Sequence, residues 1–169
     1  MSFGEQTLIG EGFAGSGPNA AHVNTVLGRK GGPVETAWAT ALATPRQGHV
    51  PFVVVLRPNL PVKPATLFAN KAPIAGERHA TLTWGAAQAG VARGVLGAVA
   101  DGVIPHAEVD DLLLIAAVWV DPSADDEEAV YEHNARGTRA ALVSAAQGRP
   151  ALDELLANRD EPQNAFFRQ

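Results

Sequence analysis

The chain has 169 residues, enough for one domain with a sizeable core, and 46% of them are hydrophobic while only 18% are charged. The formal net charge of −5 argues against a nucleic-acid surface, and no basic patch indicates membrane binding. The absence of cysteine excludes disulfides, thiolate metal sites and a thiol nucleophile. No export signal and no membrane-length apolar window is evident, which predicts a cytoplasmic protein.

Two strands joined by a glycine-rich turn are predicted at the start of the chain. The strands are 5–13 (EQTLIGEGF) and 19–28 (NAAHVNTVLG), and the turn is Gly15–Pro18. A helix follows, because Pro33 suits a first helical turn and Glu35 suits the positive end of the helix dipole. Its apolar side is expected to hold Val34, Trp38 and Leu42.

The middle of the chain alternates between apolar strands and one long helix. A buried strand is predicted over 49–58, which is rich in β-branched residues, and a second over 65–71. Residues 77–101 predict the helix, and 111–122 is the most continuous apolar run, typical of a central strand. The apolar stripe of the long helix is expected to hold Trp84, Ala87, Val91, Val95 and Val99.

A final helix is predicted after Ser123, which is expected to cap it, with acidic residues at 125–128 favouring its N-terminus. Its inner face should hold Val130, Ala135, Thr138, Leu142 and Ala145. The order ββαββαβα suits an α+β two-layer sandwich better than an alternating parallel sheet. We therefore expect one domain over 1–150 and a C-terminal tail over 151–169.

The glycines of GEGFAG match the G-x-G-x-x-G pattern of dinucleotide-binding loops at Gly10, Gly12 and Gly15. That motif requires a helix directly after it, because the pyrophosphate binds at the helix N-terminus. Here the next segment is AHVNTVLG, which has the alternation of a strand. The pattern is therefore interpreted as a flexible hairpin and not as a phosphate site.

His22 is the strongest candidate for chemistry. In a strand, His22 and Asn24 share one face roughly 6–7 Å apart, while Val23 and Thr25 share the other. An imidazole beside an amide, next to a glycine turn with room for a ligand, can transfer a proton. The competing interpretation is a histidine that makes a structural hydrogen bond, and the pattern alone leaves both open.

Other polar residues carry weaker signals. Lys71, at the end of a strand, could meet an anion or carbonyl, and Gln88 could point into a cleft from mid-helix; a solvated lysine and a neutral helix former are the alternatives. His79, His106 and His133 are expected at the surface. Helix capping explains the acids at 121–128, and no spaced histidine or carboxylate set indicates a metal site.

Several dispersed stretches resemble the formaldehyde-activating enzyme family, whose members condense formaldehyde with tetrahydromethanopterin. They appear in the family's order and cover about residues 9–150. The matching stretches are GEGFAGSGPNAAHVNTVLGRKGGPVETAWATAL, RPNLPVKPATLFANK, WGAAQAGVARGVLGAVADGVIP and VDDLLLIAAVWV. Several motifs in register are more specific than any one of them.

The resemblance implies a fold like the second domain of a small-subunit ribosomal protein, with a left-handed β-α-β crossover. It also implies a homopentamer with active sites between subunits, a role in one-carbon metabolism, tetrahydromethanopterin as co-substrate and no metal. His22 is implied to be the proton donor. The pterin contacts are implied to be Asn24, Val53, Lys71 and Gln88.

Val53 stands where the family has a leucine, which should change little, and two other departures from the family's pattern are more serious. Asn24 stands where the family usually has Asp, which keeps the shape but removes the charge. Pro73 stands where the family has Thr, which removes a hydroxyl and a backbone N–H. These departures favour an alternative, a non-catalytic homologue that binds or senses formaldehyde or a pterin. An unrelated enzyme that uses His22 on another carbonyl substrate is a third hypothesis.

Overall fold

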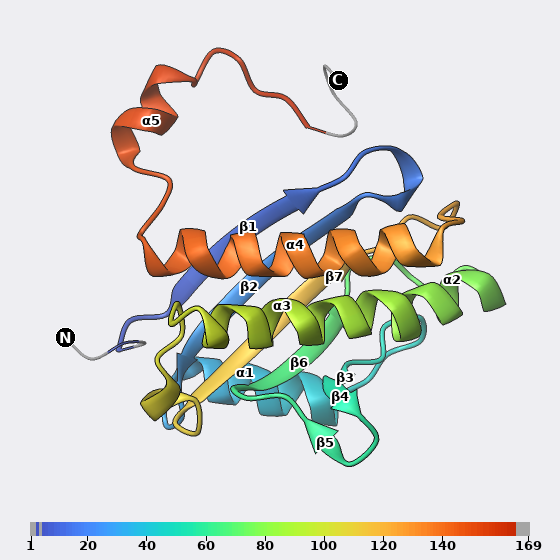
Figure 1. Ribbon diagram of the computed structural model, residues 1–169, viewed down its shortest axis with the longest axis horizontal. Helices are drawn as coiled ribbons and strands as arrows, with labels where there is room; N and C mark the ends of the chain where they lie inside the picture. The colour runs from blue at the N-terminus through green and yellow to red at the C-terminus, as the bar shows by residue number, and fades with distance from the viewer. Residues whose placement is uncertain (1–2, 4, 165–169) are drawn as a thin grey trace.

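The computed structural model describes residues 3 and 5–164, and within them one mixed sheet forms the centre of the molecule (Figure 1). Its strands lie in the order β1 (Leu8–Ala14), β2 (Ala21–Arg29), β7 (Leu112–Trp119), β6 (Ala65–Asn70) and β3 (Phe52–Val53). β6 and β7 are parallel, and the other neighbours are antiparallel. A hairpin of β4 (Val55–Arg57) and β5 (Leu60–Pro61) lies apart from this sheet.

Two long helices cover one face of the sheet, and a shorter helix lies on the other (Figure 1). The two long helices are α3 (Gln88–Ala100) and α4 (Glu127–Ala146), which lie side by side. On the opposite face α1 (Pro33–Ala43) packs against β2 and β7. The predicted α+β class is therefore confirmed.

The glycines of GEGFAG allow α4 to lie directly on β1. A Cβ atom at Gly10 would lie 2.0 Å from the carbonyl oxygen of Ala141, and one at Gly12 would lie 2.0 Å from that of Gly137. Gly15 adopts φ 85°, which favours glycine, at the turn between β1 and β2. The interpretation as a hairpin without a phosphate loop agrees with this arrangement, and the glycines serve helix–sheet packing.

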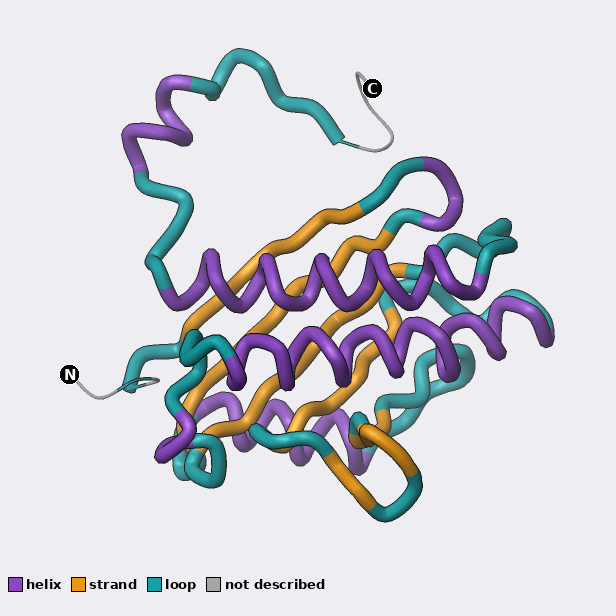
Figure 2. Tube along the Cα trace, in the orientation of Figure 1, coloured by secondary structure: helices purple, strands orange, loops and turns teal. Residues whose placement is uncertain are grey.

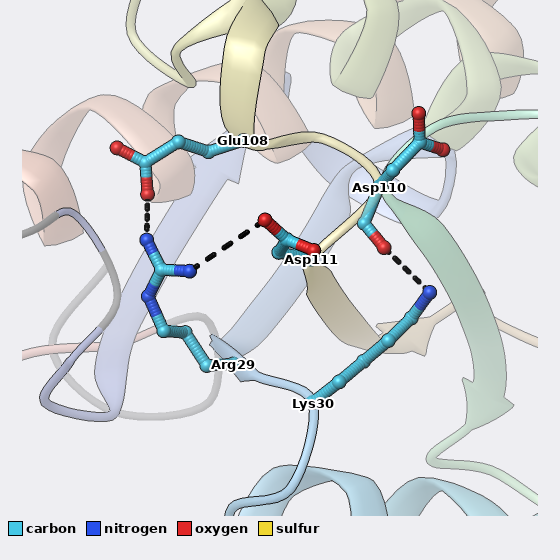
Figure 3. Close-up of polar contacts among 5 residues, drawn as sticks. All are labelled: Arg29, Lys30, Glu108, Asp110 and Asp111. Atoms are coloured by element: carbon cyan, nitrogen blue, oxygen red, sulfur yellow. Dashed lines mark hydrogen bonds and ion pairs between the residues drawn. The ribbon is translucent and has the colours of Figure 1, made fainter.

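Charged side chains join the end of β2 to the segment before β7 (Figure 3). Arg29 donates to the Glu108 carboxylate and lies 3.9 Å from the Asp111 carboxylate. The Lys30 ammonium donates to the carbonyl oxygen of Asp110, and the Lys30 N–H donates to Asp111 at 2.9 Å. These contacts join the end of β2 to the segment that leads into β7.

The long helix is confirmed but contains a segment that the sequence did not reveal. α2 (Glu77–Thr81) continues through a π-helical segment, Leu82–Ala87, into α3, and Figure 2 shows them as one continuous helix. A π turn holds an additional residue, so it rotates the residues before it relative to those after it. Trp84 is consequently 46% exposed, and its expected place in the apolar stripe is wrong.

Three further expectations fail. The predicted strand 49–58 is broken, because nearby prolines lack ladder donors and Leu56 joins the projecting β4–β5 hairpin. His79 is buried, because its Nε2–H donates to Val120 at 2.9 Å and its Nδ1 accepts from the Ala75 N–H at 3.0 Å. Asp126 caps α4 in place of Ser123.

His106 and His133 were also expected at the surface, and the structure agrees fully for only one of them. His106 is exposed, as expected. His133 is half-buried, because its Nδ1 lies 2.7 Å from the Asn19 carbonyl oxygen, beside Gly15. The expected tail contains a short helix, α5 (Leu152–Ala157), whose residues are all exposed. No helix within residues 5–164 is both long and apolar enough to cross a membrane.

Replacing Gly12 by alanine should destabilise the protein by about 2 kcal/mol, because the new Cβ overlaps backbone of α4 that cannot move freely. Gly85→Ala is the matched control, since a Cβ there meets no atom within 4 Å. Urea unfolding of both variants measures the difference. Equal stability for Gly12→Ala and wild type would contradict the close approach of α4 to β1.

Candidate active site

The alternation of β2 divides its side chains between the core and the site. Val23 and Thr25 are fully buried beneath the helices, whereas His22 and Asn24 lie on the opposite face and are half-buried. This is the division predicted from the sequence. β2 is paired on both sides, by β1 and β7, so its site face is held rigidly.

Strand register aligns residues from neighbouring strands on this face. His22 lies between Phe13 of β1 and Trp119 of β7, and Asn24 lies opposite Glu11. The His22 and Phe13 ring centroids are 6.4 Å apart. Lys71 follows β6 directly, and its backbone N–H donates to Val118 at 2.8 Å, so its side chain is anchored at the same end of the sheet.

The polar side chains pair within this row. The His22 Nε2–H donates to Glu11 Oε1 at 3.1 Å, and Lys71 Nζ donates to Asn24 Oδ1 at 2.8 Å. His22 thus has a carboxylate partner, whereas the Lys71 ammonium donates to a neutral amide. When the imidazole is protonated and Nε2–H is held by Glu11, the Nδ1–H is the proton that the ring can give.

Burial and neighbouring charges shift both titrating groups. Burial lowers the pKa of His22 below 6.5, the Lys71 ammonium lowers it further, and Glu11 opposes both effects. Burial also lowers the pKa of Lys71 to about 8, again against the attraction of Glu11. Both groups therefore lose their protons more readily than in free solution.

A cavity of about 1230 Å³ opens over these side chains, large enough for a drug-sized ligand. Its walls come from β1, β2, the turn between them, the ends of β6 and β7, and two residues far along the chain, Gln163 and Asn164. The described part of the tail therefore returns to the site. The other lining residues include Glu11, Phe13, His22, Asn24, Lys71, Trp119 and Asp121.

Two of the five expected site residues lie outside this cavity. Gln88 is buried on α3, and its Oε1 accepts from the Val55 N–H at 2.7 Å. Val53, two residues before Val55 in the chain, lies on the edge strand β3. Within one chain the structure therefore brings together His22, Asn24 and Lys71, and it places Val53 and Gln88 together at the β3 edge of the sheet.

The lining residues that sequence reasoning did not assign to the site include Glu11, Trp119 and Asp121. Glu11 could have been found from the predicted hairpin, because an antiparallel register across the Gly15–Pro18 turn sets it opposite Asn24. Trp119 and Asp121 could not, because the pairing of β2 with β7 joins distant segments. Among the residues described, no group of three or more histidines and carboxylates could hold a metal ion.

A family model described as formaldehyde-activating enzyme (Fae) matches residues 9–167. The chain belongs to this family. The match extends past residue 150, so the family includes most of the segment that we expected to lie outside the resemblance. The 13-residue extension from Ala151 to Gln163 that carries the chain back to the cavity is thus within the matched region.

Individual relatives agree with this membership. The 5,6,7,8-tetrahydromethanopterin hydro-lyase of Methanosarcina barkeri is 44% identical over 161 residues, which are 95% of this chain and 90% of that protein. The bifunctional enzyme Fae/Hps of Methanosphaera stadtmanae is 41% identical, and that of Archaeoglobus fulgidus is 37% identical. The matches cover 90% and 94% of this chain but 37% and 40% of those two bifunctional proteins.

The two charged neighbours of His22 should shift its pKa in opposite directions. Lys71→Met removes an ammonium and should raise the pKa of His22, whereas Glu11→Gln removes a carboxylate and should lower it. NMR titration of the His22 ring measures both shifts. Lys63→Met is the control, because Lys63 pairs with Asp110 at 2.6 Å away from the cavity. Unchanged titration in both site variants would show that these groups are not neighbours.

Proposed function

We propose that this chain condenses formaldehyde with tetrahydromethanopterin, giving methylene-tetrahydromethanopterin and water. The observation that carries the proposal is an imidazole, His22, in an open cavity with a carboxylate partner and an amine nearby. Membership of the formaldehyde-activating enzyme family and the 44% identity to a tetrahydromethanopterin hydro-lyase support it.

The reaction needs an acid at one defined step. A pterin nitrogen adds to formaldehyde and gives a hydroxymethylamine, whose hydroxide is a poor leaving group. Protonation by His22 lets water depart, an iminium ion forms, and the second pterin nitrogen closes the ring. General acids of this kind contribute about 10²–10⁴-fold to rates. Holding both nitrogens near one carbon supplies further acceleration.

Glu11 is the positioning residue in this scheme. Its carboxylate holds Nε2–H of His22, which fixes the ring and favours its protonated form. Burial and Lys71 lower the pKa of His22, and Glu11 raises it. Glu11 therefore keeps a larger fraction of His22 protonated at neutral pH. In this scheme the carboxylate holds Nε2–H, and the Nδ1–H of the imidazole is the proton that is given.

We place the complete site between subunits of a homopentamer. Val53 and Gln88 lie outside the cavity of their own chain, which is the observation that favours a site shared with a neighbouring copy. In this proposal the His22 cavity of one protomer meets the β3 edge of the next. A likeness to the second domain of a small-subunit ribosomal protein, a left-handed crossover around β6 and β7 and a place in the cytoplasm belong to the same proposal.

A second candidate is a non-catalytic homologue that binds or senses formaldehyde or a pterin. Asn24 and Pro73 favour it, because the amide carries no charge and the proline offers no hydrogen-bond donor. Pro73 packs against the turn at Gly48, where a Cβ would lie 3.2 Å from the proline Cβ. The proline therefore contributes to the loop beside Lys71 instead of presenting a polar group.

Removing the imidazole should abolish most of the catalysed rate. His22→Ala is expected to lower the rate of methylene-tetrahydromethanopterin formation above the spontaneous background by about 10²–10⁴-fold. Absorbance measures this rate with purified protein, formaldehyde and tetrahydromethanopterin. His106→Ala is the matched control, because His106 is exposed and its Nε2 lies 2.8 Å from the Val99 carbonyl oxygen, away from the cavity. A wild-type rate equal to background, with the pterin still bound, would establish the binding-protein alternative.

Mixed oligomers test the shared site. His22→Ala and Gln88→Ala subunits, each with little activity alone, should regain activity when they are co-expressed, because some interfaces then combine an intact His22 with an intact Gln88. The rate of methylene-pterin formation by the purified mixture measures this recovery. Co-expression of His22→Ala with Asn24→Ala is the control, since both changes lie in one cavity. No recovery in the first mixture would place the site within one chain.

A further inference from the structure

The three lysines of this chain occupy two different environments. Lys30 donates to the Asp110 carbonyl oxygen, and Lys63 pairs with the Asp110 carboxylate at 2.6 Å, both at the surface. Lys71 is half-buried in the wall of the His22 cavity, where Nζ donates to the neutral oxygen of Asn24 at 2.8 Å. It is the lysine that combines access to a ligand with a partner carrying no charge.

The backbone around Lys71 is fixed on both sides. Its own N–H donates to Val118, and Asn70 Nδ2 donates to the carbonyl oxygens of Gly48 and Ala72 at 2.7 and 2.6 Å. The Nδ1 of His49 lies 3.0 Å from the Asn70 carbonyl oxygen. The amine is thus presented from a rigid strand end and is not a mobile surface group.

We propose that Lys71 is a covalent acceptor for formaldehyde, holding the one-carbon unit as an amine adduct before the pterin receives it. The inference rests on the proposed function for its substrate, since an aldehyde must enter this cavity. It adds a role that hydrogen bonding to a pterin does not require, namely a carbon–nitrogen bond to Nζ.

Burial of Nζ favours the unprotonated form of Lys71, which is the form that reacts. Only the unprotonated amine adds to a carbonyl, and burial lowers the pKa of Lys71 to about 8. At neutral pH its unprotonated fraction is then roughly 300-fold larger than that of an ordinary lysine. The titrating groups that share the cavity are Glu11, His22 and Asp121, and the Glu11 carboxylate opposes the effect of burial.

The adduct forms in two balanced steps. The Nζ lone pair adds to the aldehyde carbon, the carbonyl electrons move to oxygen, and transfer of a proton from nitrogen to that oxygen gives a carbinolamine. Protonated His22 then donates to the hydroxyl, the carbon–oxygen bond breaks and water leaves. The nitrogen lone pair forms the double bond of an iminium ion, and His22 is left neutral.

The first step prepares the second. The ammonium of Lys71 is one of the causes that lower the pKa of His22. A carbinolamine nitrogen is far less basic than a free alkylamine, so adduct formation removes this positive charge. The imidazole consequently takes up a proton more readily at the point where an acid is needed. Lys71 and His22 thus act in sequence and need not be charged together.

Transfer to the pterin returns the enzyme to its starting state. A pterin amine attacks the iminium carbon and loses its proton, which gives a methylene bridge between Nζ and the pterin nitrogen. Protonation of Nζ and cleavage of its bond to carbon release Lys71 and leave a pterin iminium. The second pterin nitrogen adds to this carbon and gives its proton to the neutral His22, which closes the ring and restores the acid.

Reductive trapping tests the adduct without any pterin. The folded wild-type protein is mixed with substoichiometric ¹³C-formaldehyde and cyanoborohydride, whose hydride converts an iminium into a stable methylamine. Mass spectrometry of peptides then measures methylation at each lysine over time. Lys71 should be methylated at least about tenfold faster than Lys30 and Lys63. Equal or slower methylation of Lys71 would overturn the proposal.

A charge placed beside the amine provides a second test. Asn24→Asp gives the ammonium a carboxylate partner, which raises the pKa of Lys71 and should slow its trapping about tenfold. Lys63 in the same sample should react at an unchanged rate. Asn158→Asp is the matched control, since it makes the same substitution on the exposed end of α5. Trapping of Lys71 that is unaffected by Asn24→Asp would contradict the role of the neutral partner.

The two proposals fail in distinguishable ways. Rapid trapping at Lys71 without condensation above background would remove the proposed function and leave the covalent acceptor. Condensation above background with no preference for Lys71 would remove the covalent acceptor and leave the proposed function. Circular dichroism of every variant, compared with wild type, shows whether the fold is intact.

Discussion

The pairing of β2 between β1 and β7 is the constraint on which the site depends. Successive side chains on a strand point to opposite faces. β2 therefore supplies core residues beneath α4 on one face, and on the other face it supplies His22 and Asn24, which together with Glu11 and Lys71 form the polar row that we call the reactive row. A shift of one residue in register would bury His22 and expose Val23. Burial of Val23 and Thr25 therefore determines that His22 and Asn24 lie on the cavity face of β2.

The reactive row combines a small number of charged groups that are partly buried. One carboxylate, one imidazole and one amine lie around a neutral amide, so each protonation changes the cost of the next. Glu11 offsets the positive charge that would accumulate if both bases were protonated. The row is thus suited to moving protons between neighbouring groups, which is what the formation and loss of carbinolamines requires.

The sequence alone predicted most of the elements and the face that carries His22, because hydrophobic alternation and helix periodicity are local signals. It failed where tertiary contacts decide. His79 is buried because both ring nitrogens find backbone partners from other segments, and Trp84 is exposed because a π turn changes the phase of its helix. Asp121 and Trp119 joined the cavity through the pairing of distant strands.

The spacing of residues along the sequence was not enough to place all of the expected site residues. His22 and Asn24 followed from spacing, but Lys71 reached them through the parallel pairing of β6 with β7, which no short-range signal encodes. Val53 rested on resemblance alone and Gln88 partly so, and in one chain they lie at a different part of the sheet. The shared site that we propose cannot be assembled from the periodicity of a single sequence.

The returning tail has a consequence for what stability means in this protein. All described residues from 146 to 164 are exposed, yet Gln163 and Asn164 form part of the cavity wall. Segments with so little buried surface open at a lower free energy than the body to which they are attached. The ligand compartment can accordingly lose a wall while the sheet and its helices stay folded, so a melting curve and an inactivation curve would report on separate events.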